Sequence, residues 1–218
     1  MSDLLIKAVL GYLLGSIVGS LLIGRLRGGV DIRSLGSGNA GATNALRTQS
    51  KAFALGVLLI DIGKGWIATG LLAAARIPGI AAAPPHLRAW SVAICGIAVM
   101  LGHVYPLWHG FRGGKGVATL IGAVLGASPV LLIPMLVVWL LAVIVFGFVG
   151  LASILGAVAL AVGAGSSGIE PRAPLLTFAV LSAVLIAFTH RGNIARMLAG
   201  TEPRARRLWL LGAARSRS

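Results

Sequence analysis

Apolar stretches long enough to cross a lipid bilayer follow one another along nearly the whole chain. The 218 residues are 57% hydrophobic and 11% charged, and the mean hydropathy is +0.96. A bilayer core is crossed by roughly 20 consecutive apolar residues in a helix, and a helix satisfies all its own backbone hydrogen bonds. The sequence therefore predicts an all-α, polytopic membrane protein rather than a soluble domain.

We expect about seven transmembrane helices. The first stretch is long enough to span, and no small-residue cleavage site follows it, so it is not interpreted as a signal peptide. The fourth stretch is short, and we expect it to be tilted or re-entrant. The expected spans are Leu4–Gly24, Ala52–Ala75, Trp90–Trp108, Val117–Ala127, Pro129–Phe146, Leu151–Gly165 and Pro174–Thr189.

Lysine and arginine predict the orientation, because basic residues are retained in cytoplasmic loops. With the N-terminus outside and the C-terminus cytoplasmic, the inner segments hold 14 of the 19 basic residues and the outer ones hold Lys7, Arg76, Arg88 and Arg172. We expect one integral-membrane domain over residues 1–200 and a basic cytoplasmic tail over 201–218. The net charge of +14 indicates attraction to anionic membrane lipids. Nucleic acid is not an expected partner, because the basic residues gather at membrane borders without a binding motif.

Three polar, glycine-rich, basic segments interrupt this apolar sequence, at residues 36–47, 102–116 and 190–204. An unsatisfied amide or an unpaired charge near hydrocarbon costs several kcal/mol. Each segment therefore needs a ligand or a buried partner, and function is expected there.

The first segment reads GSGNAGATNALR. It matches the G-x-G-x-x-G dinucleotide pattern, but that motif requires a preceding strand, and here a transmembrane helix precedes it. Glycines still let backbone N–H groups approach an anion, and Arg47 adds a forked cation. A tight loop that caps the next helix is the alternative. The candidate ligand-binding residues are Ser37, Gly38, Asn39, Thr43, Asn44 and Arg47.

The second segment contains Gly113-Gly114-Lys115-Gly116 at the start of an apolar helix. It is not a Walker A loop, because the required first glycine and the Ser or Thr after the lysine are missing. Amides, a positive helix end and an ammonium are nevertheless suited to a phosphate. A membrane-border lysine in a flexible turn is the alternative. His103 and His109 lack partners at zinc-ligand spacing, so neither a metal nor a cofactor is expected.

Two further pairs carry polar groups at helical spacing. Asp61 and Lys64 share one face of the second span, which favours an ion pair inside the bundle, although Lys64 could also reach an anion. His190 and Asn193 lie one turn apart in the third segment. Histidine could polarise or deprotonate a hydroxyl that Asn193 orients, or it could simply stabilise a helix end.

Taken together and in order, these segments resemble the bacterial acyl-phosphate:glycerol-3-phosphate acyltransferases. The matching stretches are G-S-G-N-x-G-A-T-N-x-x-R, G-H-x-Y-P with F-x-G-G-K-G-V-A-T, and H-x-x-N-I-x-R, with Asp61-x-x-Lys64-Gly65 between the first two. The resemblance extends over nearly the whole chain. It implies a seven-helix membrane bundle in the bacterial inner membrane, with its site open to the cytoplasm.

The resemblance also implies a reaction, in which a fatty acyl group passes from acyl phosphate to the 1-hydroxyl of glycerol 3-phosphate. The products are lysophosphatidic acid and phosphate, and an acyl-phosphate-producing enzyme is a candidate partner. Ser153 joins the expected site by resemblance, while Gly150 stands where relatives often carry serine. The implied site residues are Ser37, Asn39, Thr43, Arg47, Gly113, Gly114, Lys115, Gly116, Ser153, His190 and Asn193.

The residue inventory agrees with this chemistry, since two phosphorylated substrates need cations and amides more than carboxylates. We expect Lys115 and the glycine amides to hold the donor phosphate, and Arg47, His190 and Asn193 to place glycerol 3-phosphate. The hydroxyl proton goes either to the donor phosphate or to His190. An acyl-enzyme is disfavoured, because Cys95 is remote from the motifs.

Two other classes of protein compete with this interpretation. A transporter of a small phosphorylated anion would use the same cations, but the inverted repeat of such folds is missing. A metal-dependent headgroup transferase needs a carboxylate cluster, and the five Asp and Glu residues are scattered. Direct use of coenzyme A is not expected, because no histidine is followed by aspartate five residues later.

Overall fold

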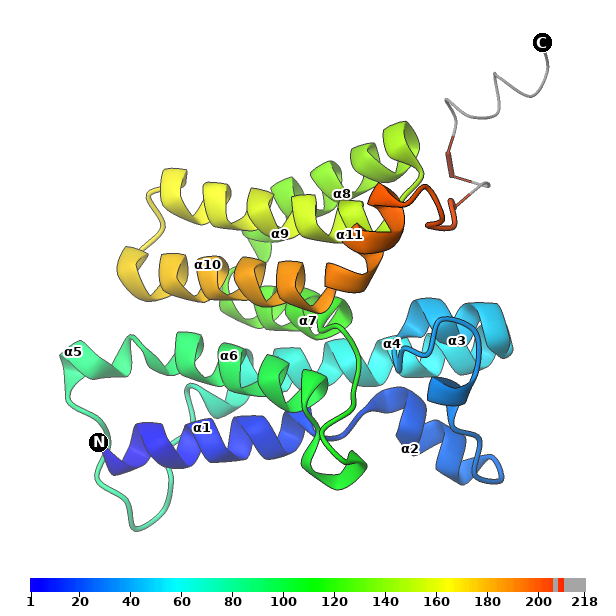
Figure 1. Ribbon diagram of the computed structural model, residues 1–218. Coiled ribbons are helices and arrows are strands. Elements are labelled where there is room, and N and C mark those ends of the chain that lie inside the picture. The colour runs from blue at the N-terminus through cyan, green and yellow to red at the C-terminus, as the bar shows by residue number, and fades with distance from the viewer. Residues whose placement is uncertain (206–207, 210–218) are drawn as a thin grey trace.

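The computed structural model describes residues 1–205 and 208–209, and within them it is entirely helical, without a strand. Figure 1 shows most helices running roughly parallel or antiparallel, with the N-terminus and α5 at one end of the bundle and α2, α3 and α11 at the other. The expectation of an all-α architecture is confirmed.

Fifteen helical elements follow one another within residues 1–205 and 208–209. They are α1 (Ser2–Gly15), α2 (Gly19–Leu26), η1 (Ile32–Ser34), α3 (Ala42–Thr48), α4 (Lys51–Trp66), the π-helix η2 (Ile67–Leu72), α5 (Pro85–Arg88), α6 (Ser91–Val104), η3 (Leu107–His109), α7 (Val117–Ala127), η4 (Pro129–Leu131), α8 (Leu132–Phe146), α9 (Val149–Ser166), α10 (Arg172–Thr189) and α11 (Arg191–Leu198).

In the part of the chain that the structure describes, five helical stretches are long and apolar enough to cross a membrane. They are Lys51–Leu72, Pro85–His109, Pro129–Phe146, Val149–Ser166 and Arg172–Thr189. The expected first span is divided into α1 and α2, which meet at 47° and make a sixth span if taken together. Helix α7 has the bounds expected from the sequence, but its 11 residues extend only about 16 Å. The count of seven transmembrane helices stays a prediction.

Glycines bring the backbones of α1 and α6 into close contact. A Cβ at Gly11 would stand 3.3 Å from the Cys95 carbonyl oxygen, and one at Gly15 would stand 2.9 Å from the Cα of Val99. Such small residues let membrane helices approach closely. The glycines at positions 11 and 15 of the first span therefore serve helix packing.

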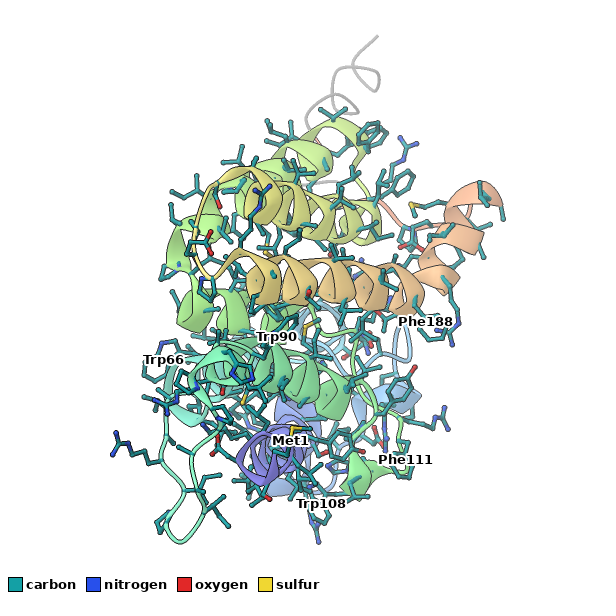
Figure 2. The ribbon with its side chains drawn as sticks, turned by 90° about the vertical axis from the view of Figure 1, so that its left-hand side faces the viewer. Met1, Trp66, Trp90, Trp108, Phe111 and Phe188 are labelled. Atoms are coloured by element: carbon teal, nitrogen blue, oxygen red, sulfur yellow. The ribbon has the colours of Figure 1, made fainter. Side chains whose placement is uncertain are left out.

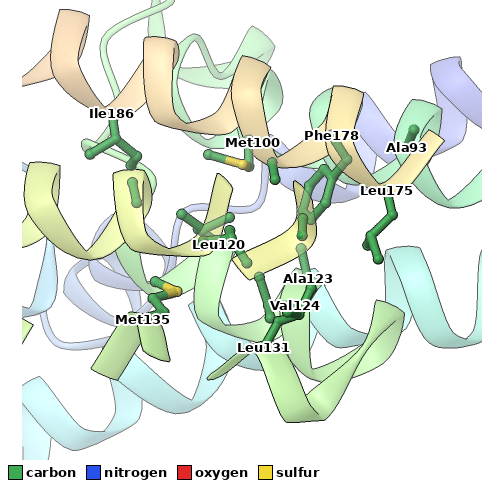
Figure 3. Packing of buried hydrophobic residues seen from close by; sticks show 14 residues of the cluster. Ala93, Met100, Leu120, Ala123, Val124, Leu131, Met135, Leu175, Phe178 and Ile186 are labelled. Atoms are coloured by element: carbon green, nitrogen blue, oxygen red, sulfur yellow. The ribbon is translucent and has the colours of Figure 1, made fainter. Parts of the chain in front are cut away.

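Helix α7 fills the middle of the bundle and carries part of the main apolar core. Figure 3 shows Leu120 of α7 beside residues of three neighbouring helices, among them Met100 of α6, Met135 of α8 and Phe178 of α10. All four side chains are buried. The short helix is thus held by packing on several sides.

An ion pair is buried where α1, α4 and α6 meet. The Lys64 ammonium lies 2.9 Å from Asp61 Oδ1, and His103 Nδ1 lies 2.8 Å from the ammonium. Lys64 also donates to the carbonyls of Gly15 and Ile17 at 2.9 and 2.7 Å, where the chain breaks between α1 and α2. These contacts satisfy carbonyls that the helix break leaves without partners. The expected ion pair inside the bundle is confirmed.

The segment after α11 folds back over the α8–α9 connection. The Ala205 amide donates to the Gly147 carbonyl at 2.8 Å, and the Trp209 indole donates to the Val145 carbonyl at 3.1 Å. The Arg204 guanidinium stacks on the Trp209 ring at 3.9 Å. Part of the predicted tail over 201–218 is therefore packed against the bundle; residues 206–207 and 210–218 lie outside the described structure.

Candidate active site

The three polar segments meet around one cavity of about 850 Å³. It lies at the end of the bundle where Figure 1 shows α3 and α11. Ten of the fourteen candidate residues line this cavity, namely Ser37, Asn39, Thr43, Asn44, Arg47, Lys115, Gly116, Ser153, His190 and Asn193. The structure thus brings together residues that are up to 156 positions apart in the chain, from Ser37 to Asn193.

Asn44 shapes the first segment from within. Its side-chain amide donates to the carbonyls of Ile32 and Leu35 at 2.9 and 3.0 Å, and its oxygen accepts from the Ser37 amide at 2.9 Å. Both donors of the side chain are therefore used inside the loop. Asn44 holds the loop that presents Ser37 and Arg47, rather than offering free donors to a ligand.

A chain of polar contacts crosses the cavity floor. The Lys115 ammonium donates to Asn193 Oδ1, and Asn193 Nδ2 donates to Glu202 at 2.6 Å. The other carboxylate oxygen of Glu202 accepts from Arg196 at 2.7 Å. The Thr189 hydroxyl donates a hydrogen bond to the Lys115 carbonyl at 3.0 Å. Lys115 and Asn193 are thus held against each other by groups on both sides.

His190 is buried and keeps one ring nitrogen without a proton. Its Nδ1 lies 2.8 Å from the Ile186 carbonyl oxygen, which can only accept a hydrogen bond, so the proton is assigned to Nδ1. Nε2 then carries the lone pair of a neutral ring. Burial lowers the pKa of His190 to about 4, so the ring is neutral near pH 7.

Positive charge gathers around Lys115. Burial lowers the pKa of its ammonium, and the nearby cations Arg196 and Arg47 lower it further, while Glu202 opposes them. Arg47 lines the same cavity from the last turn of α3. Cations that repel one another in a cavity favour the arrival of an anion.

The amides of Gly113 and Gly114 are not free for a phosphate. They donate to the carbonyls of Val104 and His103 at 3.0 and 3.1 Å. A Cβ at Gly114 would also run into the His103 imidazole. These glycines permit close packing against α6, and neither lines the cavity. Gly116, at φ +88°, begins α7 and does line it.

Two more candidates lie away from the cavity wall. Lys64 is 3% exposed and its ammonium is surrounded by the four partners described above, so its donors are occupied. The structure does not bring Lys64 to the position expected of a substrate ligand. Gly38 adopts φ +71° in a turn closed by its own amide and the Leu35 carbonyl, and its role is conformational.

Ser153 and Gly150 lie on one face of α9. The Ser153 hydroxyl donates to the Val149 carbonyl at 2.9 Å and faces the cavity. A Cβ at Gly150 would stand 2.9 Å from the Asn193 Cβ. The absence of a side chain at position 150 therefore leaves room for Asn193 in this chain.

Glu202 and the apolar wall of the cavity were not predicted from the sequence. In the sequence Glu202 is one of five scattered carboxylates, although it stands within the third polar segment. The apolar wall comes from hydrophobic helices whose faces the composition does not distinguish. The apolar lining includes Leu58, Val117, Ile121, Met135, Leu136 and Trp139.

Comparison with known proteins agrees with this geometry. The sequence profile of the family described as glycerol-3-phosphate acyltransferase matches residues 5–200. The chain belongs to this family. The enzyme is 39% identical over 201 residues to the glycerol-3-phosphate acyltransferase of Agrobacterium fabrum, covering 92% of this chain and 91% of that one. The corresponding protein of Bordetella pertussis is 42% identical over 200 residues, covering 90% of this chain and 89% of that one.

Two solved structures resemble the whole enzyme. Both are of PlsY, an integral membrane glycerol 3-phosphate acyltransferase, in its glycerol 3-phosphate form and its lysophosphatidic acid form. Each is 35% identical to the enzyme and covers 94% of it, with TM-scores of 0.81 and 0.80. The matched regions cover 96% and 95% of the two PlsY chains. The confirmed resemblance thus includes the fold.

Proposed function

We propose that the enzyme transfers a fatty acyl group from acyl phosphate to the 1-hydroxyl of glycerol 3-phosphate, giving lysophosphatidic acid and inorganic phosphate. The observation that carries this proposal is the cavity itself. Its lining combines the cations Lys115, Arg47 and Arg196 and a neutral histidine with apolar side chains from α4, α7 and α8. Two phosphorylated molecules, one with a lipid tail, match this combination. The two PlsY forms, with glycerol 3-phosphate and with lysophosphatidic acid, agree with the acceptor and the product.

The donor phosphate is placed at the start of α7. Gly116, Val117 and Ala118 line the cavity there, and α7 has no side-chain cap. The first amides of a helix have no partner within it and bind anions. Lys115, directly before them, adds an ammonium. This replaces the expected role of the Gly113 and Gly114 amides, which are occupied.

Glycerol 3-phosphate is placed between α3 and α11. Arg47 offers a guanidinium that suits a phosphate in a bidentate manner. Ser37, Asn39 and Thr43 extend along the same wall and supply neutral hydrogen-bonding groups. Ser153 faces the cavity from α9 and adds a hydroxyl to its lining.

His190 orients the attacking hydroxyl through Nε2. The hydroxyl oxygen forms a bond to the acyl carbonyl carbon, and the bond from that carbon to the phosphate oxygen breaks. With a pKa of about 4, the ring is a weaker base than a phosphate, whose second pKa is about 6 in an ester. The proton therefore passes to the departing phosphate. The cations stabilise the charge that develops on phosphate and carbonyl oxygen.

The acyl chain lies along the apolar wall. Leu136 and Trp139 of α8 and Ile121 of α7 line this part of the cavity. Burial of methylene groups there contributes about 0.8 kcal/mol each. The donor is thereby anchored by its tail while its phosphate lies at Lys115.

We place the enzyme in the bacterial cytoplasmic membrane with the cavity facing the cytoplasm, where glycerol 3-phosphate is dissolved. This orientation follows from the basic residues, which crowd the cavity end. A single catalytic domain over residues 1–200, with Glu202 and Arg204 added from the following segment, is part of the same proposal.

The test supplies purified enzyme with palmitoyl phosphate and glycerol 3-phosphate and measures lysophosphatidic acid. Palmitoyl coenzyme A and palmitoyl acyl carrier protein replace the donor in parallel reactions. We expect product from palmitoyl phosphate alone, without added metal. Product only from a thioester donor would contradict the assigned donor. Uptake of labelled glycerol 3-phosphate into proteoliposomes, without formation of lysophosphatidic acid, would instead favour a transporter of a small phosphorylated anion.

A further inference from the structure

A second cavity, of about 530 Å³, lies at the end of the bundle opposite the active site. Figure 2 looks onto this end, where Met1 and the loop between η2 and α5 face the viewer. The walls come from the first turns of α1, the end of η2, that loop and the start of α6. Its polar lining residues are Asp3, Lys7, Thr69, Arg76, Arg88 and Ser91.

Basic residues converge on this cavity from separate parts of the chain. Lys7, Arg76 and Arg88 all line it, and the single carboxylate is Asp3. These are three of the four basic residues that the sequence placed in outer segments, where basic residues are disfavoured. Scattered border residues would not be expected to meet in one hollow.

Lys7 and Asp3 form a buried ion pair in the wall of this cavity. Lys7 and Asp3 are each 3% exposed, and their charged atoms are 3.3 Å apart. The ammonium also donates to the Ala73 carbonyl at 3.0 Å, at the end of the π-helix. Since Lys7 neutralises Asp3, the guanidinium groups of Arg76 and Arg88 leave the cavity with an excess of positive charge.

A buried hydroxyl in the lining of this cavity has no hydrogen-bond partner among the described residues. Ser91 is 2% exposed, lines the cavity, and its Oγ has no hydrogen-bond partner among the described residues. A buried polar atom without a partner costs about 1–3 kcal/mol. The Ser91 hydroxyl therefore has a hydrogen bond to donate to an anion oxygen that enters the cavity.

The arginines are available to such a ligand. Both are exposed, and Arg88 has only long contacts of 3.3 and 3.4 Å to the Ala83 carbonyl. Guanidinium groups and a hydroxyl donor suit the oxygens of a phosphate, whereas a cation would be repelled. Ile77, Ile80 and Val92 add an apolar part to the lining.

We propose that this second cavity binds a phosphate group, with Arg76, Arg88 and the Ser91 hydroxyl as its ligands. The phosphate belongs either to the headgroup of an anionic phospholipid or to a free anion. The site is separate from the active site, because α1, α4 and α6 run the length of the bundle between the two cavities.

The test is a titration of the full chain in neutral maltoside detergent, in a Lys115→Ala background that weakens phosphate binding in the first cavity. The probes are dihexanoyl phosphatidylglycerol, dihexanoyl phosphatidylcholine and inorganic phosphate. The binding of each probe is measured by calorimetry. We expect phosphatidylglycerol to bind and phosphatidylcholine to bind at least about tenfold more weakly. Phosphate binding as tight as that of phosphatidylglycerol assigns the site to a free anion, and weaker phosphate binding assigns it to a lipid.

Matched variants locate the site. Arg76→Gln with Arg88→Gln should weaken binding about tenfold, which is about 1.4 kcal/mol, and Ser91→Ala should weaken it about threefold. Arg172→Gln, at the same end of the bundle but outside the cavity, should change it less than about twofold. Thermal unfolding of each variant checks its fold.

Binding unaffected by the double variant, equal binding of both lipids, or no binding of any probe would overturn the proposal. In a background that keeps Lys115, the double variant should acylate glycerol 3-phosphate at the normal rate. Because every comparison is made within one background, the result does not depend on the role assigned to Lys115.

Discussion

His190 donates its Nδ1 proton to the carbonyl oxygen of Ile186, one helical turn earlier, at 2.8 Å. This bond fixes the ring at the end of α10 and directs the lone pair of Nε2 to the other side. Nε2 can then accept a hydrogen bond from a substrate hydroxyl but cannot donate one. This contact therefore sets the hydrogen-bonding role that the ring can take toward a substrate hydroxyl.

The pH dependence of turnover tests the state of His190. Because burial lowers the pKa of His190 to about 4, the neutral ring persists as pH falls through about 6.5, the ordinary value for histidine. We expect no loss of kcat from this group until pH approaches 4. A decline in kcat with a midpoint near pH 6.5, seen in the native enzyme but not in His190→Gln, would show that the ring titrates at the ordinary histidine pKa.

The same shift predicts how stability depends on pH. Between the folded pKa of about 4 and the unfolded pKa of about 6.5, the unfolded chain binds more protons at this histidine. The stabilisation of the folded state by the neutral His190 is therefore complete above about pH 6.5, and it is lost as pH falls toward 4. Denaturant unfolding in detergent should show this decline in the native enzyme and a smaller one in His190→Gln.

Glu202 is predicted to act by positioning Asn193 and, through it, Lys115. Glu202→Gln keeps an acceptor for the Asn193 amide and loses only a half-exposed ion pair with Arg196, which is worth about 1 kcal/mol or less. Glu202→Ala removes the acceptor. We expect kcat to fall less than about fivefold in the first variant and about tenfold or more in the second. Equal rates for both variants would contradict this role.

The buried pair of Asp61 and Lys64 is predicted to stabilise the fold rather than bind substrate. Lys64→Met leaves a buried carboxylate unpaired and should cost about 3–5 kcal/mol. Adding Asp61→Asn should restore much of the loss, because an amide needs no counter-ion. Thermal unfolding of both variants decides this. A stable Lys64→Met enzyme with a raised KM for glycerol 3-phosphate would instead support a ligand role.

Gly114 tests whether the glycines before Lys115 serve packing. Gly114→Ala should destabilise the enzyme, because the added methyl group meets the His103 ring. Gly63→Ala is the control, since a Cβ there has no atom within 4 Å, and it should be neutral or stabilising by up to about 1 kcal/mol. If the melting temperatures of the two variants agree, the packing explanation is wrong.

Much of the architecture could be predicted because it depends on local patterns. The spacing of apolar residues predicts the helices, and α7 and Pro129–Phe146 have the expected bounds. The break at Ser16–Val18 could not be predicted, because Lys64 on α4 satisfies the carbonyls exposed there. The family resemblance, carried by motifs of polar residues, is confirmed by the matching profile.

The site was less predictable where a residue's partners lie far along the chain. Lys115, Arg47 and His190 face one cavity as their chemistry suggested. Whether the Gly113 and Gly114 amides are free depends on carbonyls of α6, which sequence does not reveal. Glu202 matters through its contacts with Asn193 and Arg196, and an isolated carboxylate in the sequence gives no sign of them.

The proposed reaction requires that one cationic cavity holds both phosphates, with Lys115 at the donor. The most direct measurement is the rate of lysophosphatidic acid formation from palmitoyl phosphate by Lys115→Met, beside Lys51→Met, whose side chain is exposed and outside the cavity. The account predicts a loss of about 10²-fold or more in kcat/KM for Lys115→Met and nearly full activity for Lys51→Met. A folded Lys115→Met enzyme that matches Lys51→Met in rate would contradict it.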